Sequence, residues 1–118
     1  MAESARDGSL LILVTNDGMG RSEQALQHKL IGTYLQLLDE NGMLPGAIAF
    51  YTDGVKLACK SSPVVPSLKL IQGMGVRLVL CKSCLDYFGL LEDVAVGDVG
   101  GMNDILKLLM EADHVITA

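Results

Sequence analysis

The sequence predicts a single α/β domain built on a mostly parallel β-sheet with helices on both faces. Short runs of branched apolar residues alternate along the chain with segments in which apolar residues recur at helical spacing. The apolar runs are continuous, as expected for strands that are buried on both faces. With 118 residues the chain is long enough for one hydrophobic core and too short for two.

The first half of the chain is predicted to hold two strands and two helices. Residues 10–15 (LLILVT) form the first strand, because this apolar run leads directly into the turn NDGMG. Helical spacing predicts a helix over residues 22–40, and residues 47–52 (AIAFYT) form the second strand. A helical turn and a loop are expected over residues 55–66. A crossover helix follows over residues 66–73, with proline at its start and glycine at its end.

The second half is predicted to contribute three more strands. Residues 76–80 (VRLVL) form the third strand, and a short helix is expected over residues 85–91. Residues 94–96 are a brief fourth strand, and residues 114–117 (HVIT) are the closing one. The spacing before the last strand predicts a helix, capped near Asn103, with an inward face of Ile105, Leu108, Leu109 and Ala112.

Composition and charge argue against several classes of function. Residues 1–9 lack an apolar core and a cleavage site, so they are expected to be a flexible tail before a domain at residues 10–118. The longest apolar runs are far short of the roughly 20 residues of a membrane helix, so a cytoplasmic protein with no membrane partner is expected. The net charge of −5 and the scattered basic residues argue against nucleic acid as a partner.

The segment LVLCKSCLDYF after the third strand carries the most specific chemical signal. Ligands of parallel α/β sheets gather beyond the carboxyl ends of the strands, so Cys81 and Cys84 are expected at a functional edge, beside the loops after the first two strands. A thiol that opens into a helix is favoured as the thiolate, and Lys82 adds positive charge. We interpret Cys81 as a nucleophile that carries sulfur and Cys84 as its partner, in thiol or persulfide chemistry.

Other interpretations of the cysteine pair stay open. Free cysteine is often buried, so both thiols could be inert core residues, although Lys82 and Ser83 do not suit a core. Thioredoxin-like redox chemistry is disfavoured, because the motif follows the third strand and no proline lies downstream. A zinc site needs more ligands than one pair, and the other candidates are scattered at Cys59, His28 and His114. We therefore expect no metal and no cofactor.

The loop Asn16 to Gly20 is a second candidate binding site. Its backbone N–H groups, with Asn16, could hold an anion or the sulfur-bearing group, and Asp17 and Gly18 belong to the same loop. The loop lacks the spacing of dinucleotide and Walker phosphate loops. Its glycines serve equally well to allow a tight turn. A flavin is the alternative ligand, although the chain has few rings to stack on one.

Four segments resemble the DsrE/DsrF-like sulfurtransferase superfamily: TNDGMG, FYTDGVKL, GVRLVLCKSCLDYFGL and VGDVGGMNDI. Within it, the sequence is most similar to the DsrE-like domain of the YedF subgroup. The resemblance implies a DsrEFH-like three-layer α/β/α sandwich with a five-stranded sheet and assembly into trimers or hexamers. It also implies sulfur transfer through a persulfide on Cys81, with Cys84 as the second cysteine. It also makes a TusA-like sulfur-carrier protein a candidate partner. YedF proteins usually begin with a TusA-like domain for which this chain has no room, so no intramolecular relay is expected.

Two functions therefore compete. The first is a sulfur-relay protein or sulfurtransferase that carries sulfane sulfur on the cysteine pair. The alternative is a noncatalytic oligomeric or partner-binding subunit whose cysteines are buried and inert.

Overall fold

Five parallel strands form one sheet in the order β4-β3-β2-β1-β5. The computed structural model describes residues 6–118. The strands are β1 (Arg6–Val14), β2 (Leu44–Phe50), β3 (Arg77–Cys81), β4 (Asp98–Gly100) and β5 (His114–Thr117). The predicted five-stranded sheet is confirmed, and all of its strand pairs are parallel.

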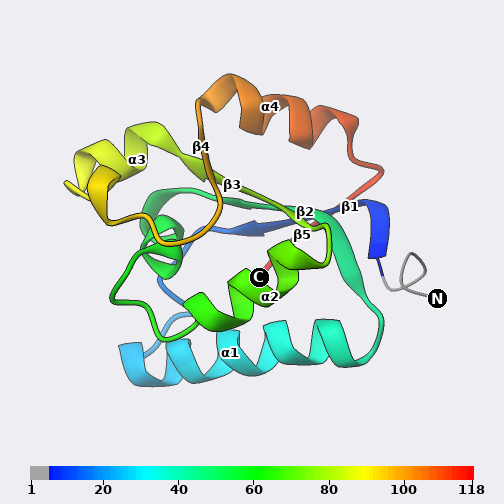
Figure 1. Ribbon diagram of the computed structural model, residues 1–118, viewed down its shortest axis with the longest axis horizontal. Coiled ribbons are helices and arrows are strands. Elements are labelled where there is room, and N and C mark those ends of the chain that lie inside the picture. Colours follow the sequence, from blue (N-terminus) through cyan, green and yellow to red (C-terminus); the bar gives the residue numbers. More distant parts are fainter. Residues whose placement is uncertain (1–5) are drawn as a thin grey trace.

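Helices cover both faces of this sheet (Figure 1). On one face lie α1 (Gln24–Glu40) and α2 (Val65–Gly73), which pack against each other. On the other face lie α3 (Lys82–Tyr87) and α4 (Met102–Glu111). Two short 3₁₀ helices, η2 (Thr52–Ala58) and η3 (Leu91–Asp93), lie in the connecting segments. The three-layer α/β/α sandwich is therefore confirmed.

The core explains why the central strands read as continuous apolar runs. Successive side chains of a strand point to opposite faces, so a strand covered by helices on both sides must be apolar at every position. Residues 11–14 of β1, 48–50 of β2 and 78–81 of β3 are all at most 7% exposed. Burial of this apolar surface is the main force that holds the sheet between its helices. Cys81 belongs to this core.

The predicted tail is partly wrong, because β1 begins at Arg6. Residues 6–9 are strand, and Arg6 and Asp7 pair with the start of β2, which itself begins at Leu44. The rest of the predicted tail, residues 1–5, lies outside the described residues.

Two later elements also differ from their predicted positions. The fourth strand lies at Asp98–Gly100, because Val94 instead bridges Cys59 in antiparallel fashion and Gly97 turns the chain at a φ of 87°. The helix after β3 begins at Lys82 with no intervening loop. It ends at Tyr87, and the residues after it form a turn and then η3.

Parallel pairing brings the ends of β1, β2 and β3 to one edge of the sheet, as predicted. The hydroxyl of Thr52, after β2, donates to the carbonyl of Thr15, after β1, at 2.5 Å. The backbone N–H of Thr52 donates to the sulfur of Cys84, after β3, at 3.1 Å. Thr52 therefore connects all three segments. None of the helices in residues 6–118 has the length and apolar character needed to cross a membrane.

Candidate functional site

The two cysteines lie where β3 passes directly into α3. Cys81 is the last residue of β3 and the N-cap of α3, and Cys84 lies within the first turn of that helix. Cys81 is 1% exposed, whereas Cys84 is partly exposed. The expectation that Cys81 lies at a reachable rim is therefore wrong, because the helices on both faces of the sheet enclose the end of β3. Cys84 is the thiol of the pair that solvent reaches.

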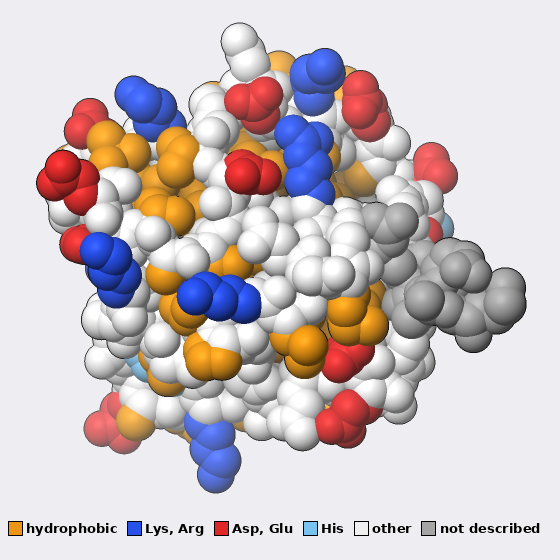
Figure 2. Space-filling model, in the orientation of Figure 1, with side chains coloured by type: hydrophobic (Ala, Val, Ile, Leu, Met, Phe, Trp, Pro, Cys, Tyr) orange, Lys and Arg blue, Asp and Glu red, His pale blue; other side chains and the backbone are white. Residues whose placement is uncertain are grey.

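Cys84 opens into a small apolar hollow of about 380 Å³. The ring of Tyr87 is 86% exposed at this hollow, and it meets the ring of Phe88 edge to face at 5.4 Å between centroids. Figure 2 shows apolar side chains gathered on the surface over α3, with charged side chains around them. The remaining residues that line the hollow are Thr52, Asp53 and Ser83. A reactant that approaches Cys84 therefore meets a mainly hydrocarbon surface.

Thr52, which also lines the hollow, donates its backbone N–H to the sulfur of Cys84. Its φ of 49° makes it the one non-glycine residue with a left-handed backbone in the described part of the chain. Such a conformation costs about 1 kcal/mol or more and persists only where the surroundings enforce it. Here the Thr52 hydroxyl donates to the carbonyl of Thr15 and also lies 2.7 Å from that of Tyr51. These contacts aim the Thr52 N–H at Cys84.

Gly54 allows this turn to lie against β1. A Cβ atom at this position would overlap the carbonyl group of Val14, so only glycine fits. The close approach brings η2 to the end of β1 and so fixes Thr52 beyond the end of β2, between the segments that follow β1 and β3.

The surroundings of Cys84 favour its neutral thiol. Burial raises the pKa of Cys84 above its ordinary value, and the side-chain hydrogen bond with Cys81 raises it further. The Thr52 N–H acts in the opposite direction and lowers the pKa, while the charge of Asp53 raises it. The net direction of the pKa shift is upward, so the surroundings of Cys84 favour its protonated form.

The loop after β1 is anchored to α1 by its own polar groups. The Asn16 side chain donates to the carbonyl of Gly20 at 2.6 Å. Gly18, with a φ of 127°, packs so closely on Gln27 that a Cβ atom would overlap it. The Asp17 carboxylate faces α1, whose side chains it binds. The tight-turn interpretation of this loop is confirmed, and its binding role stays a prediction.

The lysines near the site have different surroundings. Lys56 lies 2.7 Å from the Asp53 carboxylate, and its ammonium stands 4.4 Å from the centre of the Phe88 ring. Lys82 is exposed at the first position of α3. Its expected contribution of positive charge at the cysteines stays a prediction.

Cys59 is a core residue. It is 2% exposed, and its thiol donates to the carbonyl of Val55 at 3.4 Å. Burial, with the charge of Asp93 second, raises the pKa of this thiol. Across residues 6–118, no three or more His, Cys, Asp and Glu side chains are grouped to hold a metal ion.

Sequence reasoning missed Thr52, Phe88 and His28 as parts of the site. Thr52 and Gly54 belong to the segment TDG. From the sequence, this segment predicted only the end of a strand and not a contact with the cysteines. His28 is paired with Asp17 at 2.9 Å, a contact between a loop and a helix that no local pattern announces.

The fold and the site define a parallel three-layer α/β protein with a cysteine pair at the carboxyl edge of its sheet. The chain belongs to the DsrE/DsrF-like family, whose model matches residues 8–118. This family is related to sulfur relay. A closer relation to the YedF subgroup stays a prediction.

Solved structures share the fold at low sequence identity. The ychN protein from E. coli is 16% identical with a TM-score of 0.69, and the match covers 95% of this chain and 100% of that one. MTH1491 from Methanobacterium thermoautotrophicum, a protein of unknown function, is 20% identical with a TM-score of 0.70 and the same coverage. BT1422 from Bacteroides thetaiotaomicron, also of unknown function, is 14% identical with a TM-score of 0.67, covering 93% and 95% of the two chains. Comparison with curated proteins gave no match.

Proposed function

We propose that this chain is a sulfur-relay protein in which the Cys81/Cys84 pair handles sulfane sulfur as a persulfide, with sulfur entering at Cys84. The observation that carries the proposal is the position of the Cys84 sulfur, which is partly exposed at the hollow while the Thr52 N–H is aimed at it. Membership of a family related to sulfur relay supports the same chemistry.

The transfer step is an exchange with no net oxidation. The Cys84 thiolate attacks the outer sulfur of a donor persulfide, the donor S–S bond breaks, and the donor leaves as a thiolate with the electron pair. The Thr52 N–H, by its position, favours negative charge on the Cys84 sulfur. An acceptor thiolate takes the outer sulfur in the same way, and a TusA-like carrier is our proposed acceptor.

Persulfide formation can be measured by intact-mass spectrometry after incubation with inorganic polysulfide. We expect the wild-type chain to gain the mass of one sulfur atom, about 32 Da, and the gain to be reversed by a thiol reductant. Cys84→Ser should lose the gain. Cys59→Ser is the matched control and should keep it, since Cys59 is buried away from the hollow. A wild-type chain that takes up no sulfur would contradict the proposal.

A second candidate function is a noncatalytic subunit that assembles with copies of itself, as a trimer or hexamer. The observation that favours it is a set of exposed apolar side chains on α4 and β5. Met102, Leu106 and Met110 recur at helical spacing on α4 and are 55%, 51% and 78% exposed. Val115 and Ile116 of the edge strand β5 are 42% and 46% exposed. Several large apolar side chains that stay exposed on a folded chain are typical of a protein interface.

A further inference from the structure

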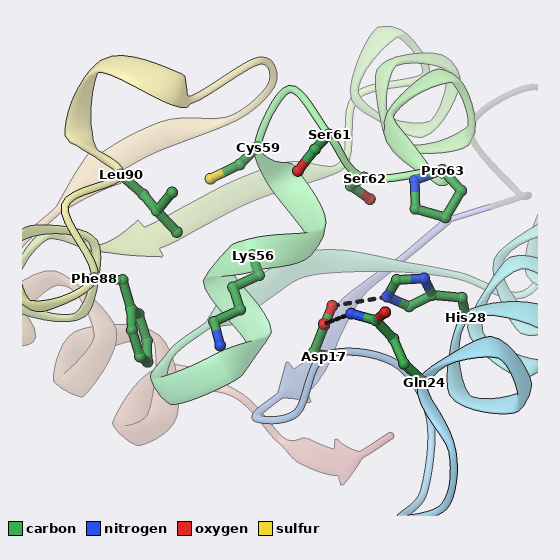
Figure 3. A pocket seen from close by; sticks show the side chains of 10 residues that line it. All are labelled: Asp17, Gln24, His28, Lys56, Cys59, Ser61, Ser62, Pro63, Phe88 and Leu90. Carbon is green, nitrogen blue, oxygen red and sulfur yellow. Dashed lines mark hydrogen bonds and ion pairs between the residues drawn. The ribbon is translucent and has the colours of Figure 1, made fainter.

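A cleft of about 690 Å³ lies between the loop after β1, η2 and the segment after α3 (Figure 3). Its walls come from the turn after β1, the first turns of α1, η2, and the loops at residues 61–63 and 88–90. Small-molecule sites in proteins commonly have volumes of roughly 300–1,000 Å³. The cleft is therefore the right size for a small molecule and larger than a single inorganic anion needs.

The cleft and the hollow at Cys84 share one wall. The ring of Phe88 lines both of them. This ring is therefore the boundary between the cleft and the hollow that holds the Cys84 thiol.

The polar groups on one side of the cleft are held in fixed positions. The Asp17 carboxylate accepts a hydrogen bond from Gln24 at 2.9 Å and pairs with the ring of His28 at 2.9 Å, and Figure 3 shows these three side chains turned toward one another. Lys56 is held by Asp53 and by the face of the Phe88 ring. Because an ammonium has three N–H donors, the Asp53 contact leaves donors for an acceptor in the cleft.

Hydroxyl groups, apolar side chains and the buried residue Cys59 complete the lining. Ser61 and Ser62 lie on the loop after η2, and the Ser62 oxygen accepts from the Val64 N–H at 3.2 Å, so its O–H is free to donate. Pro63 and Leu90 add apolar surface. The cleft thus combines donors suited to a carboxylate with a surface suited to a short hydrocarbon chain.

We propose that this cleft binds a low-molecular-weight thiol or persulfide that bears a carboxylate, with the carboxylate at Lys56 and the sulfur directed past Phe88 toward Cys84. The proposal rests on the proposed function, since such a molecule would be the sulfur donor. It names the substrate class of that same site.

Direct binding tests the proposal without any sulfur transfer. The probe is S-methylglutathione, an unreactive carboxylate-bearing thioether, titrated into ¹⁵N-labelled full-length chain. We expect amide shifts confined to residues that line the cleft, and roughly tenfold weaker binding by Lys56→Gln, the loss of about 1.4 kcal/mol that one charge-assisted hydrogen bond can supply. Lys56→Arg should restore part of the affinity. Lys60→Gln is the matched control and should bind as the wild type does, because Lys60 does not line the cleft.

The outcomes separate this proposal from the function on which it rests. A diester of the probe, with its carboxylates blocked, should bind about as weakly as Lys56→Gln binds the free acid. Shifts outside the cleft, or equal binding of the diester and the acid, would overturn the site. If the chain takes up polysulfide sulfur but does not bind the probe, the proposed binding site in the cleft is refuted and the sulfur-relay function is not. Binding by a chain that never takes up sulfur would refute the sulfur-relay function.

Discussion

Cys81 and Cys84 belong to one motif but have different surroundings. The side chain of Cys81 ends a central strand and is enclosed by the core, whereas Cys84 faces Thr52 and the hollow. A thiol must be both reachable and ionised to attack another sulfur. Cys84 meets the first condition, and its raised pKa means that it meets the second only as the pH rises.

Alkylation of Cys84 should therefore accelerate with pH across the neutral range. Because the pKa of Cys84 is raised, the thiol is protonated at pH 7, and its thiolate fraction grows by about tenfold for each pH unit below the pKa. We expect the labelling rate of the Cys81→Ser chain by iodoacetamide to rise steadily from pH 7 to pH 9. A plateau that begins near pH 7 would show an activated thiolate and contradict this account.

Replacing Thr52 should destabilise the site. Thr52→Ala removes the hydroxyl that donates to Thr15, so we expect a loss of about 1–2 kcal/mol in the free energy of unfolding in urea. Thr52→Ser keeps the donor and should lie within about 0.5 kcal/mol of the wild type. Thr33→Ala is the matched control, because its hydroxyl bonds only to Lys29 on the exposed face of α1. Equal stability of Thr52→Ala and Thr33→Ala would show that the Thr52 hydroxyl does not hold the turn.

At the level of residues, the sequence predicted that both cysteines lie at the end of the third strand, but not which of them is reachable. Position at the end of β3 follows from hydrophobic pattern. Exposure does not, because it depends on how α3 and η2 pack around that end. The role of Thr52 could not be predicted from the sequence either, because it depends on how the turn after β2 packs against Thr15.

The element that shapes the site is η2, which lies directly against the end of β1. Its segment was predicted only as a helical turn and a loop, because no periodicity marks seven residues of 3₁₀ helix. The helices and strands with long apolar patterns were placed within a few residues. β4 was misplaced because it is three residues long and two of them are exposed, so it carries no strand pattern.

A methyl group at Gly54 should push η2 away from β1. The added Cβ of Gly54→Ala would overlap the carbonyl group of Val14, so we expect the unfolding free energy to fall by about 2 kcal/mol or more. Gly73→Ala at the end of α2 is the matched control, since its added Cβ would meet open space, and it should be neutral or slightly stabilising. Guanidinium unfolding of the two variants checks this. A neutral effect of Gly54→Ala would mean that η2 is not held by the close approach.

On the scale of the whole molecule, one sheet edge gathers the candidate site residues, and large apolar side chains stay exposed on α4 and β5. The gathering at the carboxyl edge could be predicted, because it follows from parallel strands alone. The two cavities and their shared wall at Phe88 could not, since they arise where several segments far apart in the sequence meet.

A charge on the apolar face of α4 should break any assembly of copies. We expect Leu106→Asp to elute in light-scattering chromatography with the mass of a single chain, 12.6 kDa, and the wild type with a multiple of it. Lys107→Asp is the matched control, because it introduces the same side chain at the next position, which is polar in the wild type. This variant should assemble as the wild type does. A wild type that is monomeric at high micromolar concentration would refute self-assembly through this surface.

The most direct test of the account locates the sulfur atom after polysulfide treatment of the native chain. Trypsin cleaves at Lys56, Lys60, Arg77, Lys82 and Lys107, so the three cysteines fall on the separate peptides 57–60, 78–82 and 83–107. With the persulfides capped by an alkylating agent, we predict the extra mass of about 32 Da on the peptide 83–107, which carries Cys84. Extra sulfur found first on the peptide 78–82, which carries Cys81, would contradict the claim that Cys84 is where sulfur enters.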